Sequence, residues 1–159
     1  MNSLIRNIRS ITKYRQLNYL QNTLKKQETG FLQVYKPEFE HVLPKKGNYQ
    51  KLLLHEEDLF EIYYIKWRNN AVSGIHAHPN EKCFFKILEG NLHEYVYPAY
   101  TEESNLFTKH FYNSGYVGYI DDSIGVHNIV NNNNRDAYSL HLYFKNEQKF
   151  ISTFNHPHR

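Results

Sequence analysis

The sequence predicts a mainly β, single-domain protein, a sandwich or barrel of antiparallel strands preceded by helices. Three observations favour this class. The 159 residues suffice for one hydrophobic core but not for two well-packed ones. Aromatic residues make up 16% of the chain, with 14 Tyr and 10 Phe, and such side chains suit half-buried, pleated strands. After residue 48, short apolar runs recur between turn signals, as in all-β domains.

The first 27 residues form a basic segment without an acidic side chain. Its apolar residues recur at roughly helical intervals, which predicts an amphipathic helix or two short ones. We expect residues 1–45 to be a helical segment packed on the barrel, and residues 46–159 to be the barrel, in one folding unit. Two alternatives stay open, a mitochondrial-type targeting segment and an arm that binds a membrane surface or nucleic acid. The apolar positions are Leu4, Ile8, Ile11, Leu20 and Leu24, and the basic ones are Arg6, Arg9, Lys13, Arg15, Lys25 and Lys26.

The predicted strands are seven apolar or aromatic runs in the remainder of the chain. Gly90 and Asn91 separate two of these runs and predict a tight hairpin, and residues 131–136 predict a polar loop. No internal repeat or linker interrupts the pattern, so one barrel is expected. The runs are residues 52–54, 60–67, 83–88, 92–97, 116–120, 126–130 and 138–144.

Composition and charge argue against several classes of protein. The single cysteine, Cys83, cannot form an internal disulfide, and no apolar stretch approaches the length of a bilayer span. The net charge of +3 is concentrated in the N-terminal segment, and no second basic stripe follows that would bind nucleic acid. We therefore expect a cytoplasmic monomer whose partners are small molecules, with a mitochondrial location as the minor alternative.

Three histidines have the spacing of a metal site. His76 and His78 are separated by one residue, so in an extended segment both imidazoles lie on one face. His127 begins a later apolar run, which suits a third ligand from a facing strand. Three neutral imidazoles leave coordination positions open on a divalent ion, as a catalytic site requires. A second His-x-His pair, at residues 156–158, lies at the C-terminus and is expected to be an ordinary tail.

Four stretches around these residues resemble the motifs of the cupins, and specifically of the type I cysteine dioxygenase family. The similarity extends from about residue 49 to residue 143 and implies a cupin, or jelly-roll, β-barrel. Most cupins place a Glu ligand five residues after the second histidine of the motif, and this chain has Cys83 there, as the cysteine dioxygenases do. The stretches are residues 74–78, 81–92, 119–127 and 139–143.

The resemblance implies the chemistry of the site. It implies one mononuclear non-haem iron(II) ion held by His76, His78 and His127, and oxidation of a small thiol, most simply L-cysteine, to its sulfinate with O2. The substrate thiolate would supply the negative charge that a carboxylate ligand provides in other non-haem iron oxygenases. The resemblance also implies a thioether cross-link between Cys83 and Tyr143.

Ser139, His141 and Tyr143 alternate along the last predicted strand, so their side chains are expected on one face. They could simply satisfy one another's hydrogen bonds within a barrel. In the resembled family this trio orients the tyrosine hydroxyl toward substrate and dioxygen. The implied roles are therefore a hydrogen-bond donor for Tyr143 and its oriented partner for His141.

The chain departs from the family at the expected substrate carboxylate site. The family places an Arg shortly after a Tyr, whereas here Tyr49 is followed by Gln50 and Lys51. Lysine supplies the charge without the planar fork that binds a carboxylate through two hydrogen bonds. We expect Tyr49 and Lys51 to bind substrate, with a solvated Lys51 as the alternative. Gln50 keeps 3-mercaptopropionate open as the substrate, because related dioxygenases of that thiol use a Gln nearby.

Two other functions stay open on the sequence. A cupin could keep the barrel and only bind a metal or a small ligand, although such a protein has no need of Cys83, Ser139, His141 and Tyr143. A zinc hydrolase built on three histidines would need a general base, and Glu81 is the only nearby carboxylate.

Overall fold

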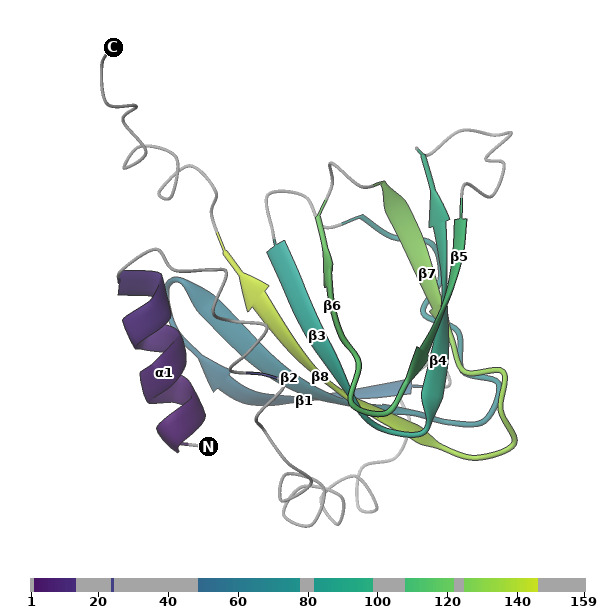
Figure 1. The fold of residues 1–159 in the computed structure, drawn as a ribbon, viewed down its shortest axis with the longest axis horizontal. Helices are drawn as coiled ribbons and strands as arrows, with labels where there is room; N and C mark the ends of the chain where they lie inside the picture. Colours follow the sequence, from purple (N-terminus) through teal and green to yellow (C-terminus); the bar gives the residue numbers. More distant parts are fainter. Residues whose placement is uncertain are drawn as a thin grey trace.

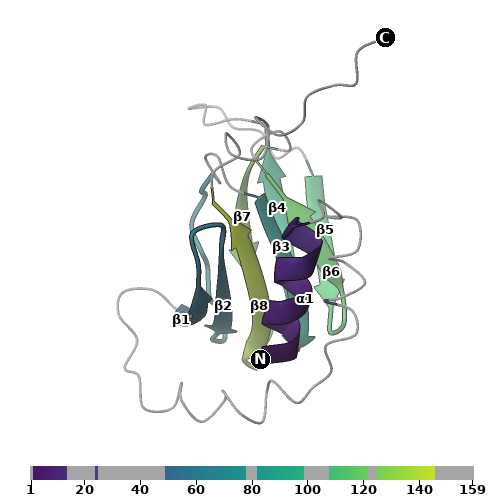
Figure 2. The same ribbon diagram turned by 90° about the vertical axis from the view of Figure 1, so that its left-hand side faces the viewer.

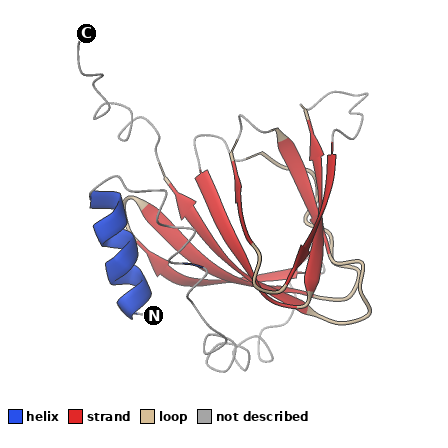
Figure 3. Ribbon diagram, viewed as in Figure 1, coloured by secondary structure: helices blue, strands red, loops and turns tan. Residues whose placement is uncertain are grey.

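The computed structural model describes residues 2–13, 24, 49–77, 82–98, 108–121 and 125–145. They form one helix and eight strands, and the strands make two antiparallel sheets (Figures 1 and 3). Among these described residues, no helix has the length and apolar character needed to span a membrane. The predicted mainly β class is confirmed. The elements are α1 (Asn2–Lys13), β1 (Tyr49–Glu56), β2 (Phe60–Trp67), β3 (Lys82–Glu89), β4 (Asn91–Tyr97), β5 (Thr108–Asn113), β6 (Val117–Ile120), β7 (Val126–Val130) and β8 (Ala137–Phe144).

All seven predicted runs coincide with strands, and only residue 116 lies outside its strand. The exception to the prediction is β5, which was not expected. This strand lies at the edge of its sheet, and Lys109, His110 and Phe111 are exposed along it. An edge strand with mostly exposed side chains has no clear alternation of apolar and polar residues, so periodicity does not reveal it.

The larger sheet has the strand order β1-β2-β8-β3-β6, and the smaller sheet has the order β5-β4-β7. Register pairing sets Lys51, Ile65, Ser139 and Ile87 in one row across four neighbouring strands of the larger sheet. Because side chains alternate along each strand, the residues two positions away from this row share its face. That face lines the inside of the barrel and carries the predicted catalytic residues of β8.

The hairpin predicted at Gly90 and Asn91 is wrong. The strands on either side of Gly90, β3 and β4, belong to different sheets, and no described residue of one pairs with the other. Gly90 has φ +75°, and a Cβ atom there would lie 2.9 Å from the Cβ atom of Ala137. Glycine is therefore required at a corner where the chain passes from one sheet to the other, and a corner uses the same turn residues as a hairpin.

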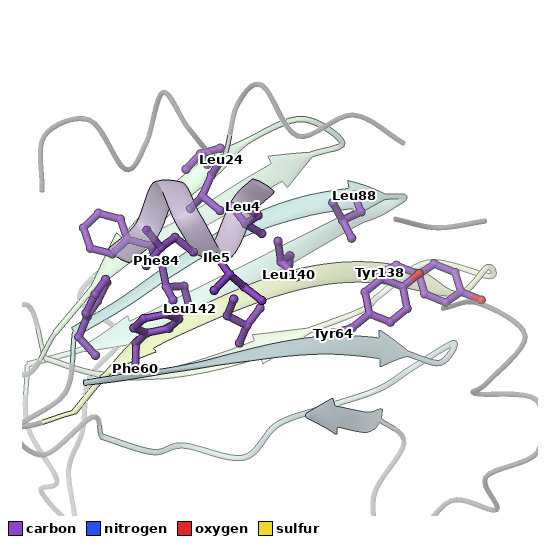
Figure 4. Packing of buried hydrophobic residues seen from close by; sticks show 14 residues of the cluster. Leu4, Ile5, Leu24, Phe60, Tyr64, Phe84, Leu88, Tyr138, Leu140 and Leu142 are labelled. Carbon is purple, nitrogen blue, oxygen red and sulfur yellow. The ribbon is translucent and has the colours of Figure 1, made fainter. Parts of the chain in front are cut away.

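Helix α1 covers the outer face of the larger sheet (Figures 2 and 4). Leu4, Ile5 and Ile8 are buried in one cluster with apolar side chains of β2, β3 and β8. Burial of each such side chain contributes about 1.5–3 kcal/mol, so this face holds the helix on the barrel. Leu24, which was predicted to share the apolar face, is buried in the same cluster. Leu20 and the side chain of Ile11 lie outside the described residues.

The polar loop predicted at residues 131–136 is confirmed, and it joins β7 to β8. Asn131 is fully buried, and its side-chain nitrogen lies 3.0, 3.1 and 2.8 Å from the carbonyl oxygens of Trp67, Arg68 and Arg135. A buried amide with this many partners is a fixed anchor. It ties the loop to the end of β2 and so positions Trp67 at the cavity.

Candidate functional site

His76 and His127 form the first part of the site. Their backbones pair as an isolated antiparallel bridge, in which each amide nitrogen lies 2.9 Å from the carbonyl oxygen of the other residue. The bridge brings the two Nε2 atoms to a separation of 3.0 Å. Two imidazoles that bind one metal ion at about 2.0–2.1 Å have their nitrogens roughly 3 Å apart. The separation therefore suits two ligands of a single ion.

The other nitrogen of each ring faces a hydrogen-bond acceptor. Nδ1 of His127 donates to Oε1 of Glu94 at 2.6 Å, and Nδ1 of His76 donates to the carbonyl oxygen of Gly74 at 2.9 Å. With hydrogen on Nδ1, the Nε2 lone pairs of the neutral rings point into the same space, where a cation would stabilise them. Burial lowers the pKa of His76, and the nearby charge of Lys51 lowers it further, which favours the neutral ligand form.

Glu94 is a buried carboxylate on β4, with 4% of its surface exposed. It also accepts a hydrogen bond from the hydroxyl of Tyr112 on β5. Burial by itself would raise the pKa of Glu94, but the hydrogen bonds from His127 and Tyr112 hold that pKa below its ordinary value. Burial raises the pKa of Tyr112, and so does its bond to Glu94, so the phenol keeps its proton. One oxygen of the Glu94 carboxylate is thus held by the Tyr112 hydroxyl, and the other oxygen holds the His127 ring in place.

His78, the third predicted ligand, and Glu81, the carboxylate considered for a hydrolase, lie outside the described residues. Within the described part of the chain, no group of three His, Cys, Asp or Glu residues is placed to hold a metal ion. The described donors are two imidazoles whose Nδ1 atoms are already engaged. Such a donor set fits a divalent ion such as iron or zinc.

A cavity of about 260 Å³ lies beside the imidazole pair. Its walls come from β1, β2, β3, β7 and β8, and from the segment that follows β2. Of the residues predicted for the site, Ser139 lies behind the wall and the others in the described part of the chain line it. The lining consists of Tyr49, Lys51, Ile65, Trp67, Ser73, His76, Cys83, Phe85, His127, Ile129, His141 and Tyr143.

Cys83, His141 and Tyr143 form a cluster on the cavity wall. Cys83 on β3 is the register partner of Tyr143 on β8. Nδ1 of His141 lies 3.6 Å from the Cys83 sulfur and 3.4 Å from the Tyr143 hydroxyl oxygen. The structure therefore brings together three of the four residues predicted to be catalytic, with the thiol and the phenol both next to Nδ1 of one imidazole.

Ser139 holds His141 from behind. The indole Nε1 of Trp67 donates to Oγ of Ser139 at 2.8 Å, and that oxygen lies 2.9 Å from Nε2 of His141. Since an indole N–H is only a donor, Ser139 accepts from Trp67, and its own proton can then be donated to Nε2 of His141. In that arrangement the proton of His141 is on Nδ1, the nitrogen that faces the Tyr143 hydroxyl.

Lys51 brings a positive charge to the cavity. Among the described residues of the lining, no other lysine or arginine occurs. Its Nζ atom lies 5.4 Å from the ring centre of Tyr143 and 5.7 Å from that of Tyr63, within the range of a cation–π contact. Tyr49 stacks on Trp67 with ring centres 5.0 Å apart. Gln50 takes the alternate position on β1 and is not part of the lining.

Three residues of the site's hydrogen-bond networks were not predicted: Trp67, Glu94 and Tyr112. The sequence did contain a signal for Glu94, because it alternates along β4 with less buried positions in the same way as the buried Leu92 and Val96 and so lies on their face. A charged residue on the otherwise apolar face of a strand indicates that it has a buried partner. The two aromatic residues carried no comparable signal, since they also suit an ordinary core.

Comparison with known proteins gives a family match over most of the chain. The model of the family described as cysteine dioxygenase type I matches residues 18–155. The chain is similar to cysteine dioxygenase type 1 of Homo sapiens, with 36% identity over 88 residues, and to that of Danio rerio, with 32% identity over 89 residues. Each match covers 53% of this chain and 44% of the relative, so the chain matches less than half the length of these relatives.

Solved structures show the same fold at low sequence identity. The Cnp3 cupin domain of Schizosaccharomyces pombe has a TM-score of 0.56 and 14% identity, and the match covers 76% of this chain and 82% of that chain. A protein of Bacillus halodurans has a TM-score of 0.55 and 18% identity, with 79% and 82% covered. These similarities concern the fold alone, and they confirm the predicted cupin barrel.

Proposed function

Because the chain belongs to the type I cysteine dioxygenase family, we propose that it is a thiol dioxygenase that oxidises L-cysteine to cysteine sulfinate with O2. One observation carries the proposal. Two imidazoles with converging Nε2 atoms and the cluster of Cys83, His141 and Tyr143 meet at the same cavity. A protein that only bound a metal or a small ligand would have no need of this second cluster.

The proposed cofactor is one mononuclear non-haem iron(II) ion, held by His76 and His127 together with His78. The fit is supported by the chemistry of the two described donors, which present their Nε2 lone pairs to one point while Glu94 and Gly74 occupy their Nδ1 atoms. Bound iron would supply the redox chemistry that lets dioxygen react with a thiol. The protein supplies position, hydrogen bonds and the exclusion of water.

The cavity favours a small, anionic thiol. Its volume of about 260 Å³ lies below the range of roughly 300–1,000 Å³ that holds drug-sized ligands. Lys51 offers an ammonium group for a substrate carboxylate, as a single charge without the fork of an arginine. L-cysteine carries such a carboxylate, and so does 3-mercaptopropionate, which is the alternative substrate. Cysteamine lacks the carboxylate and therefore isolates the contribution of Lys51.

Tyr143 is proposed to hold its hydroxyl proton toward the reacting sulfur and oxygen atoms. His141 orients the hydroxyl, and Ser139 orients His141 through the hydrogen bonds described above. Ile65, Phe85 and Ile129 give the cavity apolar walls beside these polar groups. We expect the protein to act as a cytoplasmic monomer, with the thiol and O2 as its partners.

The test is oxygen consumption by the iron(II)-loaded full chain with L-cysteine, 3-mercaptopropionate and cysteamine offered separately. We expect uptake with L-cysteine and a product heavier than the thiol by two oxygen atoms. Turnover of 3-mercaptopropionate alone would keep the reaction class and change the substrate. Absence of uptake with all three thiols, despite confirmed iron occupancy, would reject the dioxygenase in favour of a cupin that only binds.

A further inference from the structure

We propose that Tyr63 determines substrate specificity by holding the Lys51 ammonium where it meets a substrate carboxylate. The proposal rests on the proposed function for the identity of the ligand. Its geometric basis is the set of contacts around Lys51. The lining of the cavity includes Lys51 and Tyr143 but not Tyr63. Tyr63 is therefore a positioning residue, which acts through Lys51 and not by contact with the substrate.

Lys51 lies on β1, an edge strand of the larger sheet, so among the described residues a strand supports it on one side only. Its register partner on β2 is Ile65, and Tyr63, two residues before Ile65 on the same strand, is its diagonal neighbour. A long side chain reaches such a diagonal neighbour. The Lys51 Nζ atom accordingly lies 5.7 Å from the Tyr63 ring centre and 5.4 Å from the Tyr143 ring centre.

The two tyrosine rings form a corner that suits a cation. Tyr63 and Tyr143 meet edge to face, with ring centres 5.7 Å apart and an interplanar angle of 81°. The π faces of both rings attract an ammonium group. A lysine has a flexible stem and rotatable donors, whereas an arginine is preorganised by its planar fork. Contact with the two aromatic rings therefore restricts the Lys51 side chain, which lacks the rigidity of a planar guanidinium group.

Tyr63 is itself fixed from the side away from Lys51. Its hydroxyl donates to Oε2 of Glu61 at 2.9 Å, and Glu61 pairs with Lys145 at 2.5 Å. The hydroxyl is thus committed to the carboxylate, and the ring is left for Lys51. Burial and the bond to Glu61 raise the pKa of Tyr63 to about 12, so the ring stays a neutral phenol. The restraint on Lys51 consequently comes from the ring and not from a phenolate charge.

Steady-state kinetics of the iron(II)-loaded full chain test the proposal. Tyr63→Leu removes the ring, and Tyr63→Phe keeps it. The matched control is Tyr95→Leu, which removes the ring under Lys109. This cation–π contact of 5.1 Å joins β4 to β5, and neither residue lines the cavity. We expect Tyr63→Leu to raise KM for L-cysteine about three- to tenfold and to leave kcat and the KM for cysteamine nearly unchanged. Tyr63→Phe and Tyr95→Leu should both stay within about twofold of the parent protein.

A double substitution separates positioning from a general structural role. If Tyr63 acts through Lys51, the chain with both Lys51→Ala and Tyr63→Leu behaves like Lys51→Ala alone, because the coupled contact is already lost. Additive losses, or equal losses on L-cysteine and cysteamine, would overturn the proposal. Where Tyr63→Leu does not fold, Tyr63→Met fills more of the space without a ring and takes its place.

Binding without turnover distinguishes this proposal from the dioxygenase proposal. Trp67 is the only tryptophan of the chain and lines the cavity, so its fluorescence reports on a ligand there. The iron(II)-loaded chain is titrated with L-cysteine and with cysteamine in the absence of oxygen. A Kd for L-cysteine that depends on Tyr63, without turnover in air, would reject only the dioxygenase. Turnover with a Kd and KM independent of Tyr63 would reject only the role of Tyr63.

Discussion

Cys83 and Tyr143 face each other across β3 and β8 as register partners, with the His141 imidazole beside both side chains. Directly opposed residues of an antiparallel pair have their Cβ atoms about 4.5–5.5 Å apart. A sulfur one bond beyond its Cβ can approach the neighbouring tyrosine ring from that distance by side-chain rotation. The register thus allows the thioether that the sequence resemblance implies without a shift of the backbone.

The first prediction concerns the mass of the protein. The thioether that the resemblance implies would join the Cys83 sulfur to a ring carbon of Tyr143 and remove two hydrogens, with dioxygen as the oxidant. After incubation with iron(II), L-cysteine and air, the intact mass is expected to fall by about 2 Da. Cys83→Ala should keep the mass of its own sequence under the same treatment. An unchanged mass of the parent protein would rule out the cross-link and leave the dioxygenase proposal standing.

The second prediction concerns the carboxylate behind His127. Glu94→Gln keeps the shape of the side chain but removes the charge that fixes Nδ1–H of His127. Iron(II) affinity, measured by competition with a chelator, is expected to fall about 10–100-fold. Tyr112→Phe removes only the hydrogen bond that Glu94 accepts from the other side, so its loss should be smaller. Equal affinities for Glu94→Gln and the parent chain would contradict this role.

The wall of the larger sheet could be predicted from the sequence because its pattern is local. Alternation along one strand places Ser139, His141 and Tyr143 on a common face, and the resemblance to the cysteine dioxygenases brought Cys83 into the same prediction. The roles of these residues stay a prediction. The common face of Ser139, His141 and Tyr143 follows from period-two geometry, which a single strand already contains.

The contacts made by the smaller sheet could not be predicted in this way. Glu94 meets His127 because β4 pairs with β7, and Val96 is the register partner of His127. Which strands pair depends on corners such as Gly90, where the chain passes from one sheet to the other. The turn residues at Gly90 would suit a hairpin equally well, so the sequence does not reveal the corner. Tyr112 lies on β5, an edge strand without a periodic signal. The contacts of Glu94 and Tyr112 with the site could therefore be found only from the three-dimensional structure.

A third prediction addresses the hydrogen bonds behind His141. Ser139→Ala leaves the buried Nε1–H of Trp67 without the acceptor that it has in the structure. The free energy of unfolding, from urea denaturation, is expected to fall by about 1–3 kcal/mol. Ser114→Ala is the matched control, since Ser114 donates to the carbonyl oxygen of Leu88 in a less buried setting. A loss at Ser139 no larger than that at Ser114 would show that the buried network adds little stability.

A fourth prediction concerns pH and the docking of α1. Hydrogen bonds from Arg9 and His55 hold the pKa of Glu57 below its ordinary value of 4.5. A carboxyl group with a lowered folded-state pKa contributes stability above its unfolded-state pKa, and the contribution disappears as pH falls through the folded-state pKa. The difference in urea midpoint between the parent chain and Glu57→Gln should therefore be present at neutral pH. It should shrink as the pH falls below the ordinary value of 4.5 and vanish once the pH lies below the lowered pKa of Glu57. A difference independent of pH would show that the charge of Glu57 does not hold the helix.

The last prediction concerns the shape of the cavity. Gly118 on β6 is the register partner of Phe85, and a Cβ atom at Gly118 would lie 2.3 Å from Cζ of the Phe85 ring. That ring lines the cavity and stacks on His141 with centres 5.7 Å apart. Gly118→Ala must therefore displace Phe85 from its place beside His141. We expect a loss of about 1–3 kcal/mol in unfolding free energy and a weaker affinity for L-cysteine.

The double substitution Gly118→Ala with Phe85→Leu tests whether the two positions share this space. Leucine is smaller than phenylalanine and leaves room for the added methyl group, so the double variant should be more stable than the sum of the two single losses predicts. Recovery of stability without recovery of L-cysteine binding would show that the aromatic ring itself is needed beside His141. Additive losses of stability would contradict the steric account, because the cost of Gly118→Ala would then not come from Phe85.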